Sequence, residues 1–149
     1  MAVTVSAFNY GLQEILKGVD FENDALKIAL LNTSHTTNID TQQYLDDVNA
    51  NELAATGNYV AGGEIIDGSA YGTAIDTIND LAQVEEIDPV TWSALTASNI
   101  RYGVIYINTG TASTSPLLFI INFGTTYSPS SQDFTITWLY NVLLQLAQA

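Results

Sequence analysis

His35 is the only histidine in the chain, so any Ser-His-Asp or Cys-His catalytic device would have to be built around it. It lies in residues 32–38, a polar segment that reads Asn-Thr-Ser-His-Thr-Thr-Asn. The chain has no cysteine to act as a thiolate nucleophile, and no Gly-x-Ser-x-Gly elbow to present a serine. We therefore interpret His35 as a solvated loop histidine and not as a catalytic base.

Carboxylates are the other abundant group with chemical potential, and glycosidases use two of them across one cleft. The adjacent pairs at 46–47 and 85–86 do not meet that need, because neighbouring side chains on a strand point to opposite faces. Asp20, Glu22 and Asp24 alternate as in a calcium loop, but the glycine and the closing glutamate of an EF-hand are missing. These residues predict a solvated acidic surface, with a weak surface calcium site as the open alternative.

The motifs give little support for binding of carbohydrate or of phosphate groups. Eight tyrosines, five phenylalanines and two tryptophans could stack on sugars, but most of them fall on alternating strand positions, which favours core packing. Gly62-Gly63 is not followed by the Gly-Lys-Ser/Thr of a phosphate loop. We therefore expect no catalytic residue, no metal ligand and no cofactor.

The charge of the chain is distributed very unevenly. Residues 1–88 carry fifteen carboxylates against Lys17 and Lys27, whereas residues 89–149 carry only Asp133 and Arg101. A domain of this size cannot bury all of its last 61 residues, so part of this neutral segment must reach the surface. Either that surface is rich in Ser, Thr and Asn, or another protein covers it, and we favour the second interpretation.

The same charge excludes several partners. Three basic side chains and a net charge of −13 cannot supply the phosphate contacts on which nucleic-acid affinity depends, and an anionic membrane surface would repel the chain. The N-terminal residues show no secretory signal, and the longest apolar run, residues 117–121, is too short to cross a bilayer. We expect a protein that is made in the cytoplasm and binds neither nucleic acid nor membrane.

The first half of the chain predicts few regular elements. A short helix is expected over 7–17, with Ser6 as N-cap, Gly18 as its end and one apolar stripe formed by Phe8, Leu12, Ile15 and Leu16. A strand is expected over 25–31 and a helical turn within 41–47. Gly62-Gly63 predicts a bulge or turn between two short strands, and residues 67–88 predict a loop with at most one strand.

The second half predicts most of the sheet. Strands are expected over 90–95, over 100–107, over 117–123 as a strand buried on both faces, and over 133–138 with Phe134, Ile136 and Trp138 inward. Residues 139–149 fit helical and strand spacing equally well. The sum is a mainly β, antiparallel, sandwich-like or barrel-like fold with a short N-terminal helix, in a single domain over 1–149.

Six segments, taken in their order and spacing, carry a family resemblance. They are Phe8–Leu16 (FNYGLQEIL), Leu26–Ser34 (LKIALLNTS), Ile39–Val48 (IDTQQYLDDV), Gly57–Gly63 (GNYVAGG), Tyr102–Leu118 (YGVIYINTGTASTSPLL) and Phe134–Trp138 (FTITW). Over about residues 7 to 140 the chain resembles small structural proteins of tailed bacteriophages, of the capsid decoration (cement) or minor head-protein kind. The glycine that this family has at the turn after its tryptophan strand is missing from residues 139–141.

The resemblance implies a non-enzymatic virion protein on the phage capsid surface. Its expected partners are the major capsid protein and further copies of itself, as a homo-oligomer and most simply a trimer, because three capsid subunits meet at many lattice points. The alternatives are a tail or head-fibre subunit, or a carbohydrate- or calcium-binding β-module. We place the interface in the weakly charged region 91–149, since a docking patch needs good packing and few charges. The residues expected to carry it are Trp92, Arg101, Tyr102, Tyr106, Phe119 and Phe123.

Overall fold

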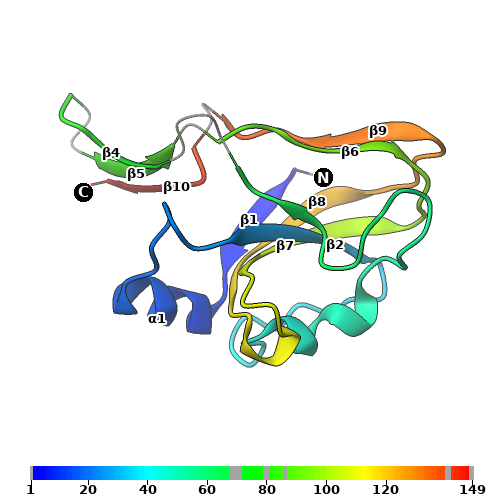
Figure 1. Cartoon of the computed structure of the whole chain (residues 1–149), viewed down its shortest axis with the longest axis horizontal. Helices are drawn as coiled ribbons and strands as arrows, with labels where there is room; N and C mark the ends of the chain where they lie inside the picture. Colours follow the sequence, from blue (N-terminus) through cyan, green and yellow to red (C-terminus); the bar gives the residue numbers. More distant parts are fainter. Residues whose placement is uncertain (1, 68–71, 79–80, 86, 140–141, 148–149) are drawn as a thin grey trace.

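A five-stranded antiparallel sheet forms the centre of the molecule. The computed structural model describes residues 2–67, 72–78, 81–85, 87–139 and 142–147. Within them the sheet has the order β1-β8-β7-β2-β3 (Figure 1). Its strands are β1 (Thr4–Ala7), β8 (Leu117–Tyr127), β7 (Ile100–Ile107), β2 (Leu26–Asn32) and β3 (Glu64–Ile65).

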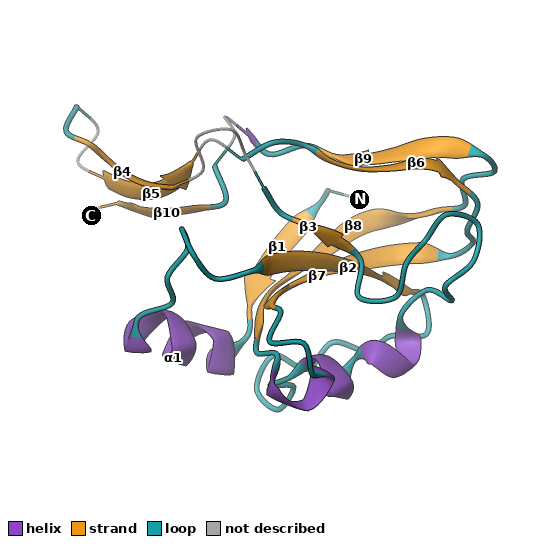
Figure 2. Ribbon diagram, in the orientation of Figure 1, coloured by secondary structure: helices purple, strands orange, loops and turns teal. Residues whose placement is uncertain are grey.

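Two smaller antiparallel sheets complete the strand content. β6 (Val90–Leu95) pairs with β9 (Gln132–Ile136) above one face of the central sheet, while β4 (Gly72–Asp76), β5 (Leu81–Glu85) and β10 (Leu144–Ala147) form a separate three-stranded sheet (Figure 2). The order of that last sheet is β10-β5-β4. The expected mainly β, antiparallel, sandwich-like fold with one N-terminal helix is confirmed.

Both faces of the central sheet are covered, which explains why its middle strands are almost entirely apolar. On one face Leu118 and Ile121 of β8 join Trp92 and Leu95 of the β6–β9 pair in the larger core cluster. On the other face a smaller cluster fills the space beneath the short 3-10 turns η1 (Leu45–Asp47), η2 (Asn49–Asn51) and η3 (Ala112–Thr114). The strands predicted over 25–31 and over 117–123 are confirmed, the second with side chains buried on both faces.

The helix α1 (Asn9–Lys17) differs from the prediction at its start. Ser6 does not cap it, because residues 4–7 pair with β8 as an edge strand, and Phe8 occupies the N-cap position. Its end is as predicted, since Gly18 adopts a left-handed conformation at φ 107° and donates its N–H to the carbonyl of Ile15. Among the described residues no helix is long and apolar enough to span a membrane.

The helix packs on the sheet through a glycine and not through its leucines. A Cβ added to Gly11 would lie 2.5 Å from the carbonyl oxygen of Leu117, so only glycine permits this approach. Of the predicted apolar stripe, Phe8 is buried and Ile15 half-buried, whereas Leu12 and Leu16 are exposed. Only part of the predicted apolar stripe therefore faces the core.

The sequence pattern gave the weakest secondary-structure prediction for residues 67–88 and for the C-terminal segment. Residues 67–88 hold two strands, β4 and β5, where at most one was expected, although positions 68–71, 79–80 and 86 lie outside the described residues. The end of the chain forms the strand β10, which resolves the choice between helix and strand for its described part. Pairing with β5, far away in sequence, makes that choice, because a four-residue strand is not stable alone.

Candidate docking surface

Four of the six residues expected to carry an interface are core residues. Trp92 and Tyr106 are each 1% exposed, and Phe119 and Phe123 are each 7% exposed. Their strands belong to a sheet that is covered on both faces, so the alternation that makes them conspicuous in sequence points them into the protein's own interior. The prediction that these four side chains form an interface is wrong.

The other two residues are half-buried on β7. The ring of Tyr102 meets His35 edge to face, with 5.3 Å between ring centroids. Arg101 lies where the pairing of β7 with β8 shifts register between Ile100 and Tyr102, and it makes no ion pair with any described residue. A role of Arg101 in assembly stays a prediction.

His35 is not the solvated loop residue that its polar neighbours suggest. It is 4% exposed, and its Nε2 has no hydrogen-bond partner among the described residues. Burial lowers the pKa of His35, so the ring is neutral in the folded protein at neutral pH. A neutral imidazole packed on Tyr102 acts as part of the core.

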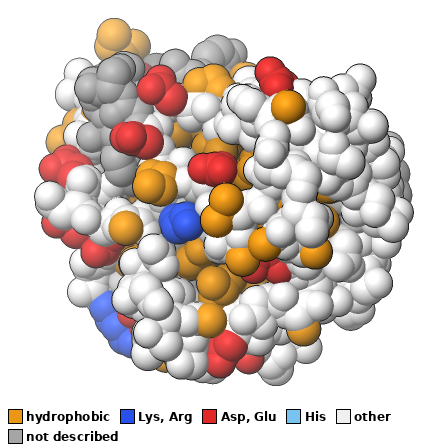
Figure 3. Space-filling view, turned by 45° about the vertical axis from the view of Figure 1, so that its right-hand side comes forward, with side chains coloured by type: hydrophobic (Ala, Val, Ile, Leu, Met, Phe, Trp, Pro, Cys, Tyr) orange, Lys and Arg blue, Asp and Glu red, His pale blue; other side chains and the backbone are white. Residues whose placement is uncertain are grey.

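The surface contributed by residues 89–149 is rich in hydroxyl groups. Its exposed polar side chains are almost all uncharged: Thr91, Ser93, Thr96, Ser98, Asn99, Asn108, Thr109, Thr111, Ser113, Thr114, Thr125, Thr126, Ser128, Ser130, Ser131, Gln132, Thr135, Thr137 and Gln145. In the view of Figure 3 charged side chains gather on the left, and the right-hand part of the surface is uncharged. The neutral segment therefore reaches water through Ser, Thr and Asn, which is the interpretation we did not favour. A covering protein is not needed to explain it.

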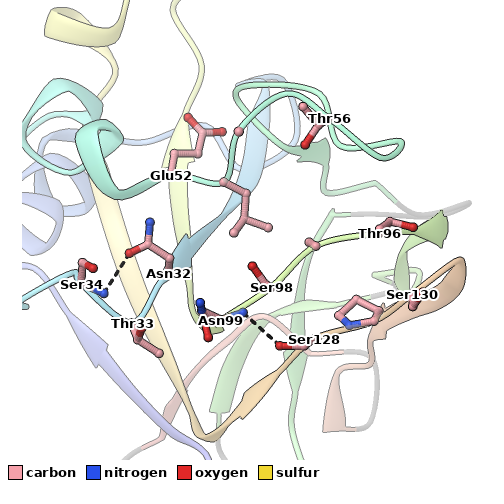
Figure 4. A pocket seen from close by; sticks show the side chains of 14 residues that line it. Asn32, Thr33, Ser34, Glu52, Thr56, Thr96, Ser98, Asn99, Ser128 and Ser130 are labelled. Carbon is pink, nitrogen blue, oxygen red and sulfur yellow. Dashed lines mark hydrogen bonds between the residues drawn. The ribbon is translucent and has the colours of Figure 1, made fainter.

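A polar hollow of about 660 Å³ opens where β2, the β6–β7 turn and the β8–β9 turn meet (Figure 4). Its lining contains hydroxyls, amides and the carboxylate of Glu52, but no aromatic ring on which a sugar could stack. The Oε1 atom of Glu52 already accepts hydrogen bonds from the Tyr59 hydroxyl at 2.8 Å and from the Gly62 N–H at 2.6 Å. This carboxylate holds the loop over β2 in place, so we interpret the hollow as a structural feature.

The acidic loop after α1 uses its carboxylates internally. Asp20 accepts hydrogen bonds from the Asn23 side chain and from the backbone N–H groups of Glu22 and Asn23, which lowers the pKa of Asp20. Asp24 in turn accepts from the N–H of Asp20. Among the residues described, no group of three or more His, Cys, Asp or Glu side chains is arranged to hold a metal ion.

The strongest candidate site is an apolar groove between α1 and the three-stranded sheet. The strand registers place Thr73, Val84 and Leu144 side by side, and then Ile75, Ala82 and Leu146, all on one face of the sheet. The opposite face is mixed, with Asp76, Gln83, Glu85 and Gln145 beside the apolar Ala74 and Leu81. The more apolar face, with Ile75, Val84 and Leu144, lines a groove of about 550 Å³ together with Ile15 of the helix.

The helix covers only the inner end of this apolar face. Val84 is buried in the larger core cluster together with Phe21, and Ile15 and Leu144 pack against that cluster. Toward the outer end the cover is missing, so Ile75 is 79% exposed and Leu146 is 62% exposed. We call this open outer part, formed by Ile75, Ala82 and Leu146, the docking face.

Carboxylates are frequent in the segments next to the groove. The helix and the loop after it carry Glu14, Asp20, Glu22 and Asp24, whereas Asp76 and Glu85 lie on the opposite face of the sheet. Their only described cation is Lys17, and its Nζ lies 2.7 Å from the Glu14 carboxylate. Glu22 also accepts hydrogen bonds from the backbone N–H and the hydroxyl of Thr73, which ties the acidic loop to β4 at the inner end of the sheet, where Thr73 pairs with Val84.

Sequence reasoning missed this surface although part of its signal was visible. The alternation Thr73-x-Ile75, Ala82-x-Val84 and Leu144-x-Leu146 has strand period, but each run is too short to stand out among acidic residues. That the three runs share one face follows only from pairings across the chain.

In the comparisons with known proteins, no family model, no curated protein and no solved structure matches this chain.

Proposed function

We propose that this chain is a non-enzymatic structural protein of a bacteriophage virion, a capsid decoration protein that attaches to the major capsid protein. The observation that carries the proposal is the docking face, an apolar sheet surface that the chain itself covers only at one end. Large apolar side chains gathered on one surface are typical of protein–protein interaction sites. The phage assignment comes from the order of sequence segments that resemble decoration and minor head proteins.

A binding role also fits the way the remaining conspicuous groups are used. His35, Trp92 and Tyr106 are buried, Asp20 is engaged by its own loop, and Glu52 holds a turn. The hydroxyl-rich surface of residues 89–149 keeps that side of the protein hydrated without strong charge. A tail or head-fibre subunit is the second candidate, because the same docking face would serve attachment there.

The test is sedimentation of the purified chain with capsids of the phage that encodes it, prepared without the chain. A decoration protein binds saturably, at a copy number that matches the capsid lattice. Binding at only a few copies per particle would favour the tail or fibre alternative. The absence of binding to any virion particle would overturn the proposal, and light scattering of the free chain tests the expected trimer.

A further inference from the structure

Two tyrosines from distant parts of the chain meet at the start of α1. The hydroxyl oxygens of Tyr10 and Tyr44 are 2.6 Å apart, and the centroids of their rings are 5.1 Å apart at an interplanar angle of 59°. We infer that this pair is a site of oxidative cross-linking, at which a one-electron oxidant joins the two rings as dityrosine. The inference goes beyond the proposed function and does not depend on it, because it concerns the chemistry of the chain alone.

The geometry of the pair brings the reactive carbons of the two rings together. In a tyrosyl radical the unpaired electron is shared between the phenolic oxygen and ring carbons that include the two Cε atoms beside it. Rings that met only tip to tip through their hydroxyls would have centroids much farther apart than 5.1 Å. The rings of Tyr10 and Tyr44 therefore lie side by side, which places the Cε atoms of one ring next to those of the other.

Hydrogen bonds next to the pair hold it in this arrangement. Asn9 precedes Tyr10 on the helix. The Asn9 backbone N–H donates to the Ile39 carbonyl at 3.0 Å, and its side-chain amide donates to the Asp40 carboxylate at 2.7 Å. These bonds tie the start of the helix to the segment that leads to Tyr44. Because reactants held in contact combine far faster than free ones, coupling within the pair should exceed coupling to other tyrosines.

The cross-linking step removes one electron and one proton from each ring. The hydrogen bond with Tyr44 raises the pKa of Tyr10 to about 12, so Tyr10 is a phenol near neutral pH and releases its proton as it is oxidised. The two radicals form one carbon–carbon bond between Cε atoms, and the hydrogen on each of these carbons then moves to the ring oxygen, which restores both phenols. With a haem peroxidase as catalyst, one hydrogen peroxide takes up the two electrons and two protons and becomes two waters.

The described part of the chain offers no comparable pair. Every other ring contact among these residues includes at most one tyrosine. Both Tyr10 and Tyr44 are half-buried, which leaves part of each side chain in contact with solvent. The chain has no cysteine, so a disulfide cannot link its segments. A dityrosine between these two positions would restrict the unfolded chain and stabilise the fold in the way that a disulfide does.

The test oxidises the full-length chain at low concentration with a haem peroxidase and hydrogen peroxide, and then isolates the monomer. Trypsin cuts after lysine and arginine, and the chain has only three such residues. The fragment 1–17 contains Tyr10 as its only tyrosine, whereas Tyr44 lies in the fragment 28–101. We expect dityrosine fluorescence in the monomer, and a mass that joins these two fragments with the loss of two hydrogen atoms. Tandem mass spectrometry should place the second end of the link at Tyr44.

Variants of the two tyrosines locate the link. Tyr10→Phe and Tyr44→Phe should each lower the dityrosine yield of the monomer at least about tenfold, since each removes one of the two paired phenols. Tyr127→Phe is the matched control and should keep the wild-type yield. Tyr127 is 41% exposed, and its ring packs on Phe123 and Phe134 and on no tyrosine among the described residues. If a variant does not fold by circular dichroism, the fragment map of the wild-type chain still decides.

Three results would overturn the inference. The first is a monomer without dityrosine under conditions that cross-link free tyrosine. The second is a link in the monomer that joins Tyr10 to a tyrosine other than Tyr44, and the third is a wild-type yield in Tyr44→Phe. Sedimentation with capsids bears on the proposed function alone, so the failure of either proposal leaves the other standing.

Discussion

The central five-stranded sheet and the peripheral three-stranded sheet are built from similar alternating strands, but only the first is covered on both faces. In the central sheet Ile28 and Ile105 pack under the β6–β9 pair, while Ala29 and Val104 pack against the turns on the other side. In the peripheral sheet only the inner end of the apolar face meets a covering element, and Ile75 stays in water. An apolar strand face therefore becomes part of the core or stays exposed, according to whether another element packs on it. The variants below test that difference, from the largest expected effect to the smallest.

Trp92→Ala should lower the free energy of unfolding by about 3–5 kcal/mol. The indole is 1% exposed, lies 6.4 Å from the Tyr59 ring and 6.0 Å from the Phe134 ring, and would leave a large cavity between the two layers. Urea unfolding followed by circular dichroism measures the change. Ile78→Ala, at a side chain that is 90% exposed, is the control, and a loss below about 1 kcal/mol in Trp92→Ala would contradict the assignment of Trp92 to the core.

Gly11→Ala should destabilise the fold by about 1–3 kcal/mol, although alanine is the better helix former by about 1 kcal/mol. The added methyl group would lie 2.5 Å from the Leu117 carbonyl oxygen and 2.7 Å from the Leu118 Cα, so helix and sheet must move apart. Thermal unfolding is the measurement, with the exposed helix position Gln13→Ala alongside it. A stabilised Gly11→Ala protein would show that the helix does not approach β8 this closely.

Glu52→Gln should cost about 1–2 kcal/mol, because the hydrogen bonds from the Tyr59 hydroxyl and the Gly62 N–H then end on a neutral acceptor. The Tyr59 hydroxyl also accepts the Leu30 N–H, so the loop over β2 should loosen as well. Hydrogen exchange of the Leu30 and Gly62 amides reports this local change, and the exposed Asp46→Asn provides the comparison. Unchanged exchange at both amides would argue against this role of Glu52.

The wild-type protein should lose stability below about pH 6.5 relative to a His35→Phe variant. Burial lowers the pKa of His35 in the folded state, so below pH 6.5 the unfolded chain takes up a proton that the folded chain resists. Above that pH the ring is neutral in both states and this contribution does not change. Unfolding in urea at pH 7.5 and at pH 5 measures it, and parallel pH profiles for the two proteins would rule it out.

Ile75→Ser should change the free energy of unfolding by less than about 0.5 kcal/mol, the smallest effect of the series. The side chain is 79% exposed at the open end of the peripheral sheet, so the folded chain gains little from it. Chemical unfolding with the Ile65→Ser control checks this directly. A loss of more than about 1 kcal/mol would mean that the open end of the apolar face is part of the monomer's core after all.

The strands with long apolar runs could be predicted from sequence, and the reason lies in their burial. Residues 25–31 and 117–123 are apolar apart from Lys27 and Asn122, and such stretches occur where a strand is covered on both faces. Gly18 also ends its helix as predicted, because glycine adopts positive φ without a steric penalty. These are local properties that need no knowledge of what lies nearby.

The exposed apolar face could not be predicted, because the same sequence pattern marks strands that are buried and strands that stay exposed. Phe119 and Phe123 are conspicuous aromatic residues, and their own sheet buries them. Ile75 is an inconspicuous aliphatic residue in an acidic segment, and it stays exposed. For His35 the error was the reverse: it was predicted to be solvated and is buried, because its polar neighbours in the sequence do not show that the ring packs against Tyr102.

By itself the amino-acid sequence determined the fold class, the net charge of −13 and the main strands, because composition and period-two alternation act over a few neighbouring residues. Only the tertiary structure decided which apolar faces are covered. That outcome depends on strand pairings such as that of β10 with β5, between residues about sixty positions apart, and on where the short helix α1 packs. At the outer end of the peripheral sheet Ile75 and Leu146 stay exposed, whereas Val84 at its inner end is buried in the larger core cluster.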